Sequence, residues 1–211
     1  MSSDAIDMTM MIVSHDAFRR DLGHLKRAVE QRSAEDPERR RAVQNGWELF
    51  KLQLENHHTN EDKSIWPRMR NGLRDRPDDL LVLDAMEAEH EQIDPLLAAV
   101  DGALADPETG QDRFAQAIAE LDASLTGHLT HEERDALPLV DVALTPAEWQ
   151  ETAKDMRDLI GLKGAADFFP WLLDGAPDKD ADAILKLMPA PARMMYRRMW
   201  VPKYAKEQRW G

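Results

Sequence analysis

Four stretches of the chain repeat their apolar residues at every third or fourth position, which is the period of an α-helix with one buried face. Segments rich in proline, glycine, serine and aspartate separate these stretches. No stretch alternates valine, isoleucine and aromatic residues with polar ones, as a half-buried strand does. The pattern therefore predicts an all-α protein whose four helices form an up-down-up-down bundle.

Turn-forming residues set the predicted ends of these helices. The first pattern dissolves in residues 33–37, and the third fades in residues 106–110. The second and the fourth stop at Pro67 and Pro138. Because proline lacks a backbone N–H and clashes with the preceding turn, we expect both helices to end there.

A histidine interrupts each apolar stripe at a core-facing position. The four are His15, His57, His90 and His128. On adjacent antiparallel helices, side chains lie at the same height when they are equally far from the connecting loop. The sequence midpoints between successive histidines fall at residue 36, between residues 73 and 74, and at residue 109, all in predicted loops. We therefore expect the four histidines to meet in one layer of the bundle.

Two of these histidines have a glutamate one helical turn further on, in the pairs His57 with Glu61 and His128 with Glu132. Four residues rotate a helix by about 40° beyond a full turn, so each pair shares a face. The chain has no cysteine, so any metal must be held by histidine and carboxylate. Four imidazoles and two carboxylates predict a dinuclear centre that favours iron, with manganese or zinc as alternatives. The competing interpretation is a metal-free scaffold, in which each unsatisfied buried polar group would cost about 1–3 kcal/mol.

The net charge limits the classes of partner that the protein is expected to bind. The 211 residues include 40 acidic and 27 basic side chains, which give a net charge of −13. Such a surface repels phosphate, so no nucleic-acid partner is expected. The sequence has neither a basic leader nor an apolar run of about 18 residues, so we expect no transmembrane segment and a cytoplasmic protein.

The pattern changes after the fourth helix. Thr145, Pro146 and Glu148 combine an N-cap residue, a proline at the first helical position and a capping-box glutamate, which predicts a fifth helix. We expect a bundle domain over residues 1–143 and a C-terminal helical extension over residues 144–211.

The last segment, residues 186–211, reverses the charge of the chain. It carries about +6, which leaves about −19 on the rest. We interpret its methionines and tryptophans as an apolar docking face; these are Met188, Met194, Met195, Met199, Trp200 and Trp210. We expect the basic residues to dock this tail onto the acidic bundle and restrict access to the centre. A protein partner or a second copy of the chain is the alternative.

The order H, HxxxE, H, HxxxE over about residues 8–140 resembles the hemerythrin-like, or HHE cation-binding, domain. The resemblance implies a four-helix bundle that holds a non-haem, oxygen-bridged di-iron centre, with Glu61 and Glu132 as bridging ligands and the histidines as terminal ones. It implies a protein that binds or senses a small oxidant, which is oxygen, nitric oxide or peroxide. The alternative is an enzyme with catalase-like or peroxidase-like activity in defence against oxidative or nitrosative stress. No catalytic residue is assigned.

The sequence departs from the oxygen-carrying members in two places. Their third helix carries HxxxH, whereas Met86 and Asp94 flank His90 here. Their fourth helix carries HxxxxD, which is replaced by HxxxE. One imidazole is therefore missing from the expected set, and Asp94, Glu87 or a water molecule could fill its place.

Three further histidines lie outside the pattern. His58 and His131 border the metal face, and each could be a ligand, a hydrogen-bond donor behind a ligand, or an exposed neighbour. His24 lies half a turn around the first helix from His15, so we expect it to face solvent.

Overall fold

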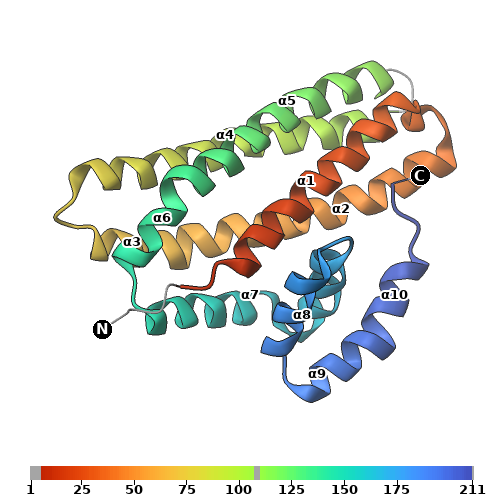
Figure 1. The fold of residues 1–211 in the computed structure, drawn as a ribbon. Helices are drawn as coiled ribbons and strands as arrows, with labels where there is room; N and C mark the ends of the chain where they lie inside the picture. Colours follow the sequence, from red (N-terminus) through yellow and green to blue (C-terminus); the bar gives the residue numbers. More distant parts are fainter. Residues whose placement is uncertain (1–5, 107–109, 211) are drawn as a thin grey trace.

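A computed structural model describes residues 6–106 and 110–210, and the secondary structure in these ranges is helical, as predicted, with no strand. Four long helices lie side by side, and consecutive ones run in opposite directions (Figure 1). They are α1 (Thr9–Glu30), α2 (Pro37–Asn60), α4 (Pro77–Ala105) and α5 (Gly110–His131). Helix α1 contacts α2 and α5, and α4 contacts α2 and α5. The short helix η1 (Ser33–Glu35) joins α1 to α2, whereas residues 107–109, part of the third predicted loop, lie outside the described residues.

The helical backbone does not end at Pro67 or at Pro138, so the prediction that the second and fourth helices end there is wrong. Each continues through one turn of π-helix into a further α-helix without a break. The continuations are η2 (Glu61–Ile65) with α3 (Trp66–Gly72), and η3 (Glu132–Ala136) with α6 (Leu137–Ala143).

The π turns explain how both prolines fit. In each turn the backbone bond spans five residues, so Trp66 N–H donates to the Glu61 carbonyl, and the equivalent bond follows Glu132. The extra residue places Pro67 in the first turn of α3 and Pro138 in the first turn of α6. Proline is common in the first turn of a helix, because its fixed φ suits the helical backbone.

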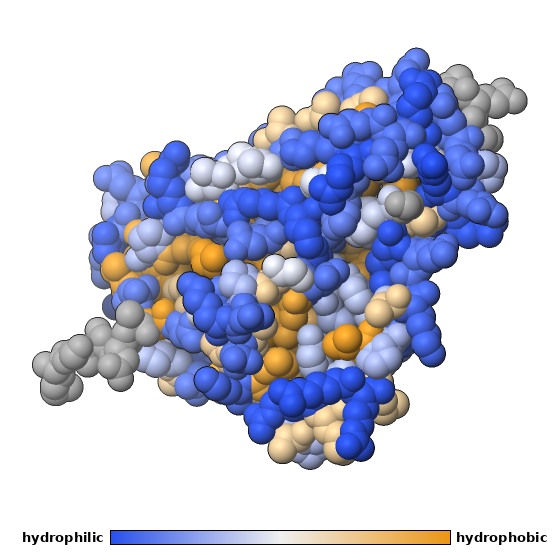
Figure 2. Space-filling view, turned by 45° about the vertical axis from the view of Figure 1, so that its right-hand side comes forward, coloured by the Kyte–Doolittle hydropathy of each residue, from blue (hydrophilic) through white to orange (hydrophobic). Residues whose placement is uncertain are grey.

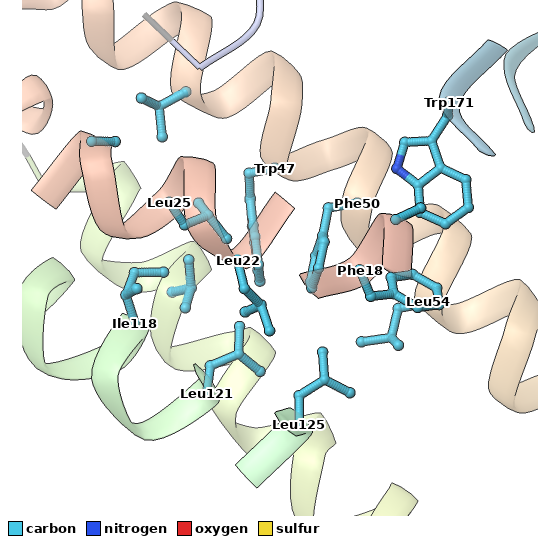
Figure 3. Packing of buried hydrophobic residues seen from close by; sticks show 14 of the residues in the cluster. Phe18, Leu22, Leu25, Trp47, Phe50, Leu54, Ile118, Leu121, Leu125 and Trp171 are labelled. Atoms are coloured by element: carbon cyan, nitrogen blue, oxygen red, sulfur yellow. The ribbon is translucent and has the colours of Figure 1, made fainter. Parts of the chain in front are cut away.

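Two apolar clusters fill the interior on either side of the predicted histidine layer. The larger contains residues of all four long helices and of the C-terminal extension, and it is drawn in part in Figure 3. The smaller contains residues of α3 and α6. On each long helix, taken with its continuation, the histidine lies in sequence between residues of the two clusters, as His15 lies between Met11 and Phe18. The polar layer is therefore enclosed by apolar packing above and below.

The C-terminal extension lies beside α1 and α2 (Figure 1). Its elements are α7 (Pro146–Leu173), α8 (Asp178–Leu187), α9 (Ala190–Met195), the π turn η4 (Tyr196–Trp200) and α10 (Val201–Lys206). The predicted capping box at the start of α7 is confirmed, because Thr145 and Glu148 bond each other's backbone. Helix α7 kinks at Gly161, whose φ of 61° favours glycine. The division between residues 143 and 144 stays a prediction.

Two tryptophans attach the extension to the bundle. The ring of Trp171 is buried 5.0 Å from the Phe18 ring (Figure 3). Its indole N–H donates to Asp21 at 2.8 Å. At the end of the chain, Trp210 N–H donates to the carbonyl of Ala42 at 2.9 Å. The Trp210 ring stacks on His24 with 5.3 Å between centroids, so His24 is half-buried rather than facing solvent as predicted.

The basic tail does not dock through its charges in the way predicted. Lys203 pairs with Asp167 of α7 at 3.1 Å, and Arg209 pairs with its neighbour Glu207. These partners belong to the extension itself. The tail contacts α2 through Trp210 and through the Asn45 amide, which donates to the Gln208 carbonyl at 3.1 Å. Hydrophilic residues cover most of the face in Figure 2, with hydrophobic ones visible between them. Over the described ranges, no helix is long and apolar enough to cross a membrane.

Candidate metal centre

The structure brings the six predicted residues together in one buried layer. They are His15, His57, Glu61, His90, His128 and Glu132, and none exposes more than 7% of its surface. The Nε2 atoms of His15 and His57 lie 3.2 Å apart, and those of His90 and His128 are also 3.2 Å apart. The equal-height argument from the loop midpoints thus agrees with the geometry.

The donor atoms fall into two groups, each within a span of 4.8 Å. The first half contains His15, His57, Glu61 and Glu132, and the second half contains His58, His90 and His128. The two glutamates connect the halves. Glu61 places Oε1 3.1 Å from Nε2 of His57 and Oε2 3.5 Å from Nε2 of His90. Oε2 of Glu132 lies 3.2 Å from Nε2 of His15 and 4.0 Å from Nε2 of His128.

His58, which the sequence left open, lies in the same layer. Its ring is buried and stacks on His90 with centroids 3.9 Å apart, and its Nε2 has no hydrogen-bond partner among the described residues. The layer therefore contains five imidazoles, because α2 supplies the one that α4 lacks. The suggested replacements lie elsewhere, since Asp94 is exposed and Glu87 pairs with Arg70 at 2.7 Å. The adjacent pair of histidines at 57 and 58 was the available sequence signal.

Carboxylates behind three imidazoles orient them. The Nδ1 atoms of His15, His90 and His128 donate to Glu133 at 2.8 Å, Asp62 at 2.8 Å and Glu89 at 2.9 Å, respectively. Each bond turns the opposite nitrogen, Nε2, toward the centre. His131 donates to the second oxygen of Glu89 at 2.7 Å, so it lies behind His128 and outside both donor groups. The sequence did not identify these three carboxylates.

Burial disfavours the charged forms of Glu61, His57 and His58, whereas nearby carboxylates favour the charged form of His15. Burial raises the pKa of Glu61 well above its usual range, and the nearby Glu132 carboxylate raises it further. Burial lowers the pKa of His57 and His58 well below that of free histidine. Burial also lowers the pKa of His15, but Glu132 and the adjacent carboxylate outweigh burial and raise it to about 9. Carboxylates and imidazoles are thus concentrated where neither is well solvated.

The donor set fits a pair of cations. Among the described residues, all four carboxylate oxygens of Glu61 and Glu132 lack a hydrogen-bond partner, although two lie within 3.2 Å of imidazole nitrogens. Leaving one buried polar atom unsatisfied costs about 1–3 kcal/mol, so a layer with several is unfavourable on its own. Bound cations would pair these oxygens and the free Nε2 of His58. Imidazole with carboxylate is a donor set for iron, manganese or zinc.

The surroundings of the two halves differ. On the first half, Phe18 lies 5.2 Å from the His57 ring, and Trp171 of α7 covers Phe18. The second half borders a cavity of about 550 Å³ between α2 and α4, with His58 and His90 in its wall. The His57 side of the first half is covered by apolar side chains, and the second half borders a cavity.

Comparison with protein families gives a single finding. The family model described as the hemerythrin HHE cation binding domain matches residues 8–140, which is more than half of the chain. Neither the curated proteins nor the solved structures yield a match. The matched range begins before α1 and ends within α6, so it contains every residue of both donor groups. The chain therefore belongs to the hemerythrin HHE cation-binding family.

Proposed function

We propose that this protein holds two non-haem iron ions and uses them to bind or sense a small oxidant, namely oxygen, nitric oxide or peroxide. The observation that carries the proposal is the sharing of Glu61 and Glu132, whose buried oxygens have no other partner, between two groups of imidazoles. The proposed ligands are His15 and His57 for one ion, His58, His90 and His128 for the other, and both glutamates as bridges.

The two halves are proposed to have different roles. When bound, an iron pair supplies reversible electron transfer and a coordination position for a small ligand. The first half offers two imidazoles and the second offers three. Because the carboxylates are shared, the first half has one donor fewer, and we assign the free position to it.

The residues around the donors support this assignment. Glu133 fixes His15 through Nδ1, which leaves Nε2 available as a ligand. Phe18 and Trp171 keep water away from the His57 side, and apolar walls favour a small neutral molecule over a charged one. Within the described residues, both tyrosines, Tyr196 and Tyr204, lie in the extension, away from the donor groups.

Metal content and optical spectra test the proposal. Protein from iron-replete cells is expected to contain about two iron ions per chain, and fewer than about one would contradict a dinuclear centre. Glu61→Ala is expected to lose the metal. A matched control, His24→Gln, removes a histidine that lies outside both donor groups and is expected to keep it.

Addition of oxygen, nitric oxide and peroxide in separate experiments then separates binding from catalysis. A stable spectral change with oxygen or nitric oxide, without turnover, supports a binding or sensing protein. Rapid evolution of oxygen from peroxide, lost in Glu61→Ala, supports the enzymatic alternative instead. Absence of any response from iron-loaded protein would contradict both.

A further inference from the structure

The cavity between α2 and α4 is lined by acidic side chains. Five carboxylates and one basic residue contribute to its wall; they are Glu55, Asp62, Glu87, Glu91, Asp94 and Lys51. Asp62 and Glu87 already have partners, in His90 and Arg70. These contacts account for two of the five carboxylates.

The outer part of the cavity carries unbalanced negative charge. Glu55, Glu91 and Asp94 are exposed, and none of the three has an ion pair with any described residue. The basic lining residue does not neutralise them, because the Lys51 amino group pairs with Asp101 at 2.8 Å. A cleft lined by one sign of charge raises the local concentration of the opposite ion.

The inner wall of the cavity presents a free metal donor. His58 is 92% buried, since only 8% of its surface is exposed, and its Nε2 has no hydrogen-bond partner among the described residues. His90 lies next to it in the wall, stacked on the His58 ring. Carboxylates at the surface bind hydrated cations, whereas imidazoles hold transition metals more tightly, so the donor strength for such a metal increases inward.

The other approaches to the centre are less favourable for a cation. Helix α7 packs on α1 and α2, and Trp171 closes the side of the first half. At the edge between α1 and α5, the guanidinium of Arg19 lies 2.7 Å from Glu133 and neutralises this carboxylate. A cation approaching by that edge meets a carboxylate that is already paired, whereas three carboxylates of the α2–α4 cavity have no ion pair with any described residue.

We propose that divalent metal ions enter the centre through the α2–α4 cavity, attracted by Glu55, Glu91 and Asp94 and received by His58. This inference rests on the proposed function, because it presupposes that the centre binds metal. The three exposed carboxylates act on the rate of metal uptake, whereas the buried donors determine how much metal is held. Their removal is therefore expected to slow loading without changing the final metal content.

The test follows Co²⁺ uptake by the metal-free protein, using the visible absorption of the coordinated ion. The cavity variant is Glu55→Gln with Glu91→Gln and Asp94→Asn. At about 10 mM ionic strength its uptake rate constant is expected to fall about 10-fold relative to the unmodified chain. At about 0.5 M salt the difference is expected to shrink, because exposed charges are screened.

A control variant removes the same number of charges elsewhere. Glu30→Gln, Asp158→Asn and Asp182→Asn change exposed residues on α1, α7 and α8, which do not line the cavity. This control is expected to load within about twofold of the unmodified rate, because the attraction of a charge for an approaching cation weakens with distance and these three residues lie away from the cavity.

Each remaining outcome has a distinct meaning. An unchanged uptake rate in the cavity variant, with full final Co²⁺ content, overturns the cavity route and leaves the proposed function intact. Equal slowing in both variants also overturns it, because net charge rather than position would then control loading. Failure of the unmodified chain to bind Co²⁺ or iron overturns the proposed function together with this inference.

Discussion

The two halves of the donor layer contain the same kinds of side chain in different surroundings. The half with His15 and His57 is enclosed by Phe18 and by Trp171 from the extension. The half with His58 and His90 borders a cavity between two bundle helices. All donor residues lie on the bundle, whereas the extension covers only the half with His15 and His57.

The largest effect is expected from removing Glu61 and Glu132, the two carboxylates that connect the halves. With metal in about thousandfold excess over Kd, each bound ion is expected to stabilise the protein by about 4 kcal/mol, or about 8–16 °C in Tm. In the double variant Glu61→Ala with Glu132→Ala, added metal is expected to raise Tm by less than about 2 °C, because both halves lose their carboxylates. Calorimetry with and without iron measures both values.

The control for this comparison is Glu30→Ala with Glu120→Ala, which removes two exposed glutamates from α1 and α5. It is expected to keep the full metal-dependent increase. An equal increase in the Glu61 and Glu132 variant would show that the shared carboxylates do not hold metal.

The next largest effect is expected from a substitution that removes a donor from the second half only. His58→Leu places in α2 the residue type that α5 has at Leu129, directly after His128. We expect the metal content to fall from about two ions to about one, and the metal-dependent rise in Tm to fall by about half. Elemental analysis checks the stoichiometry. Retention of both ions would exclude His58 as a ligand.

A smaller effect concerns the shield over the first half. Trp171→Phe keeps the apolar ring but removes the N–H that donates to buried Asp21 at 2.8 Å. The orphaned carboxylate oxygen is expected to lower the free energy of unfolding by about 1–3 kcal/mol in urea titration. Trp149→Phe is the control, since its N–H donates to a carbonyl in an exposed contact; we expect a change within about 0.5 kcal/mol. An equal loss of unfolding free energy in both variants would show that the hydrogen bond from Trp171 to Asp21 does not contribute more than an exposed one.

The smallest effect is expected at the end of the chain. A Cβ at Gly46 would lie 2.5 Å from the Trp210 ring, whereas a Cβ at Gly102 meets nothing within 4 Å. Gly102→Ala is expected to stabilise its helix by about 0.5–1 kcal/mol. In Gly46→Ala we expect the displaced Trp210 to offset that gain, so that net stability changes by less than about 1 kcal/mol.

Fluorescence and limited proteolysis of the tail report the displacement of Trp210 directly. We expect the Gly46→Ala protein to be cut faster near its C-terminus and the Gly102→Ala protein to be cut at the original rate. Identical cleavage of the two would mean that Trp210 does not depend on Gly46.

Periodicity and spacing predicted the helical class and the layer of six residues, because a helix converts sequence distance into direction. The π turns could not be predicted in this way. A proline looks like a helix end from its own chemistry, and only the bonds around Trp66 show an extra residue before Pro67. His58 was uncertain because its direction depends on how α2 is rotated against α4. The position of the Trp210 ring could not be predicted either, because the ring packs where Gly46, a residue distant in sequence, has no side chain.

The two halves of the donor layer are related by an approximate twofold symmetry within one chain. The carboxylates that directly follow Glu61 and Glu132 show it. Asp62, after Glu61, accepts from His90, and the residue after Glu132 accepts in the same way from His15. A perfect twofold would give both metal positions identical surroundings. The symmetry is broken by His58, whose counterpart is a leucine, and by α7, which covers one side only. If two ions occupy the layer as proposed, the inequivalent halves would give them unequal numbers of protein donors.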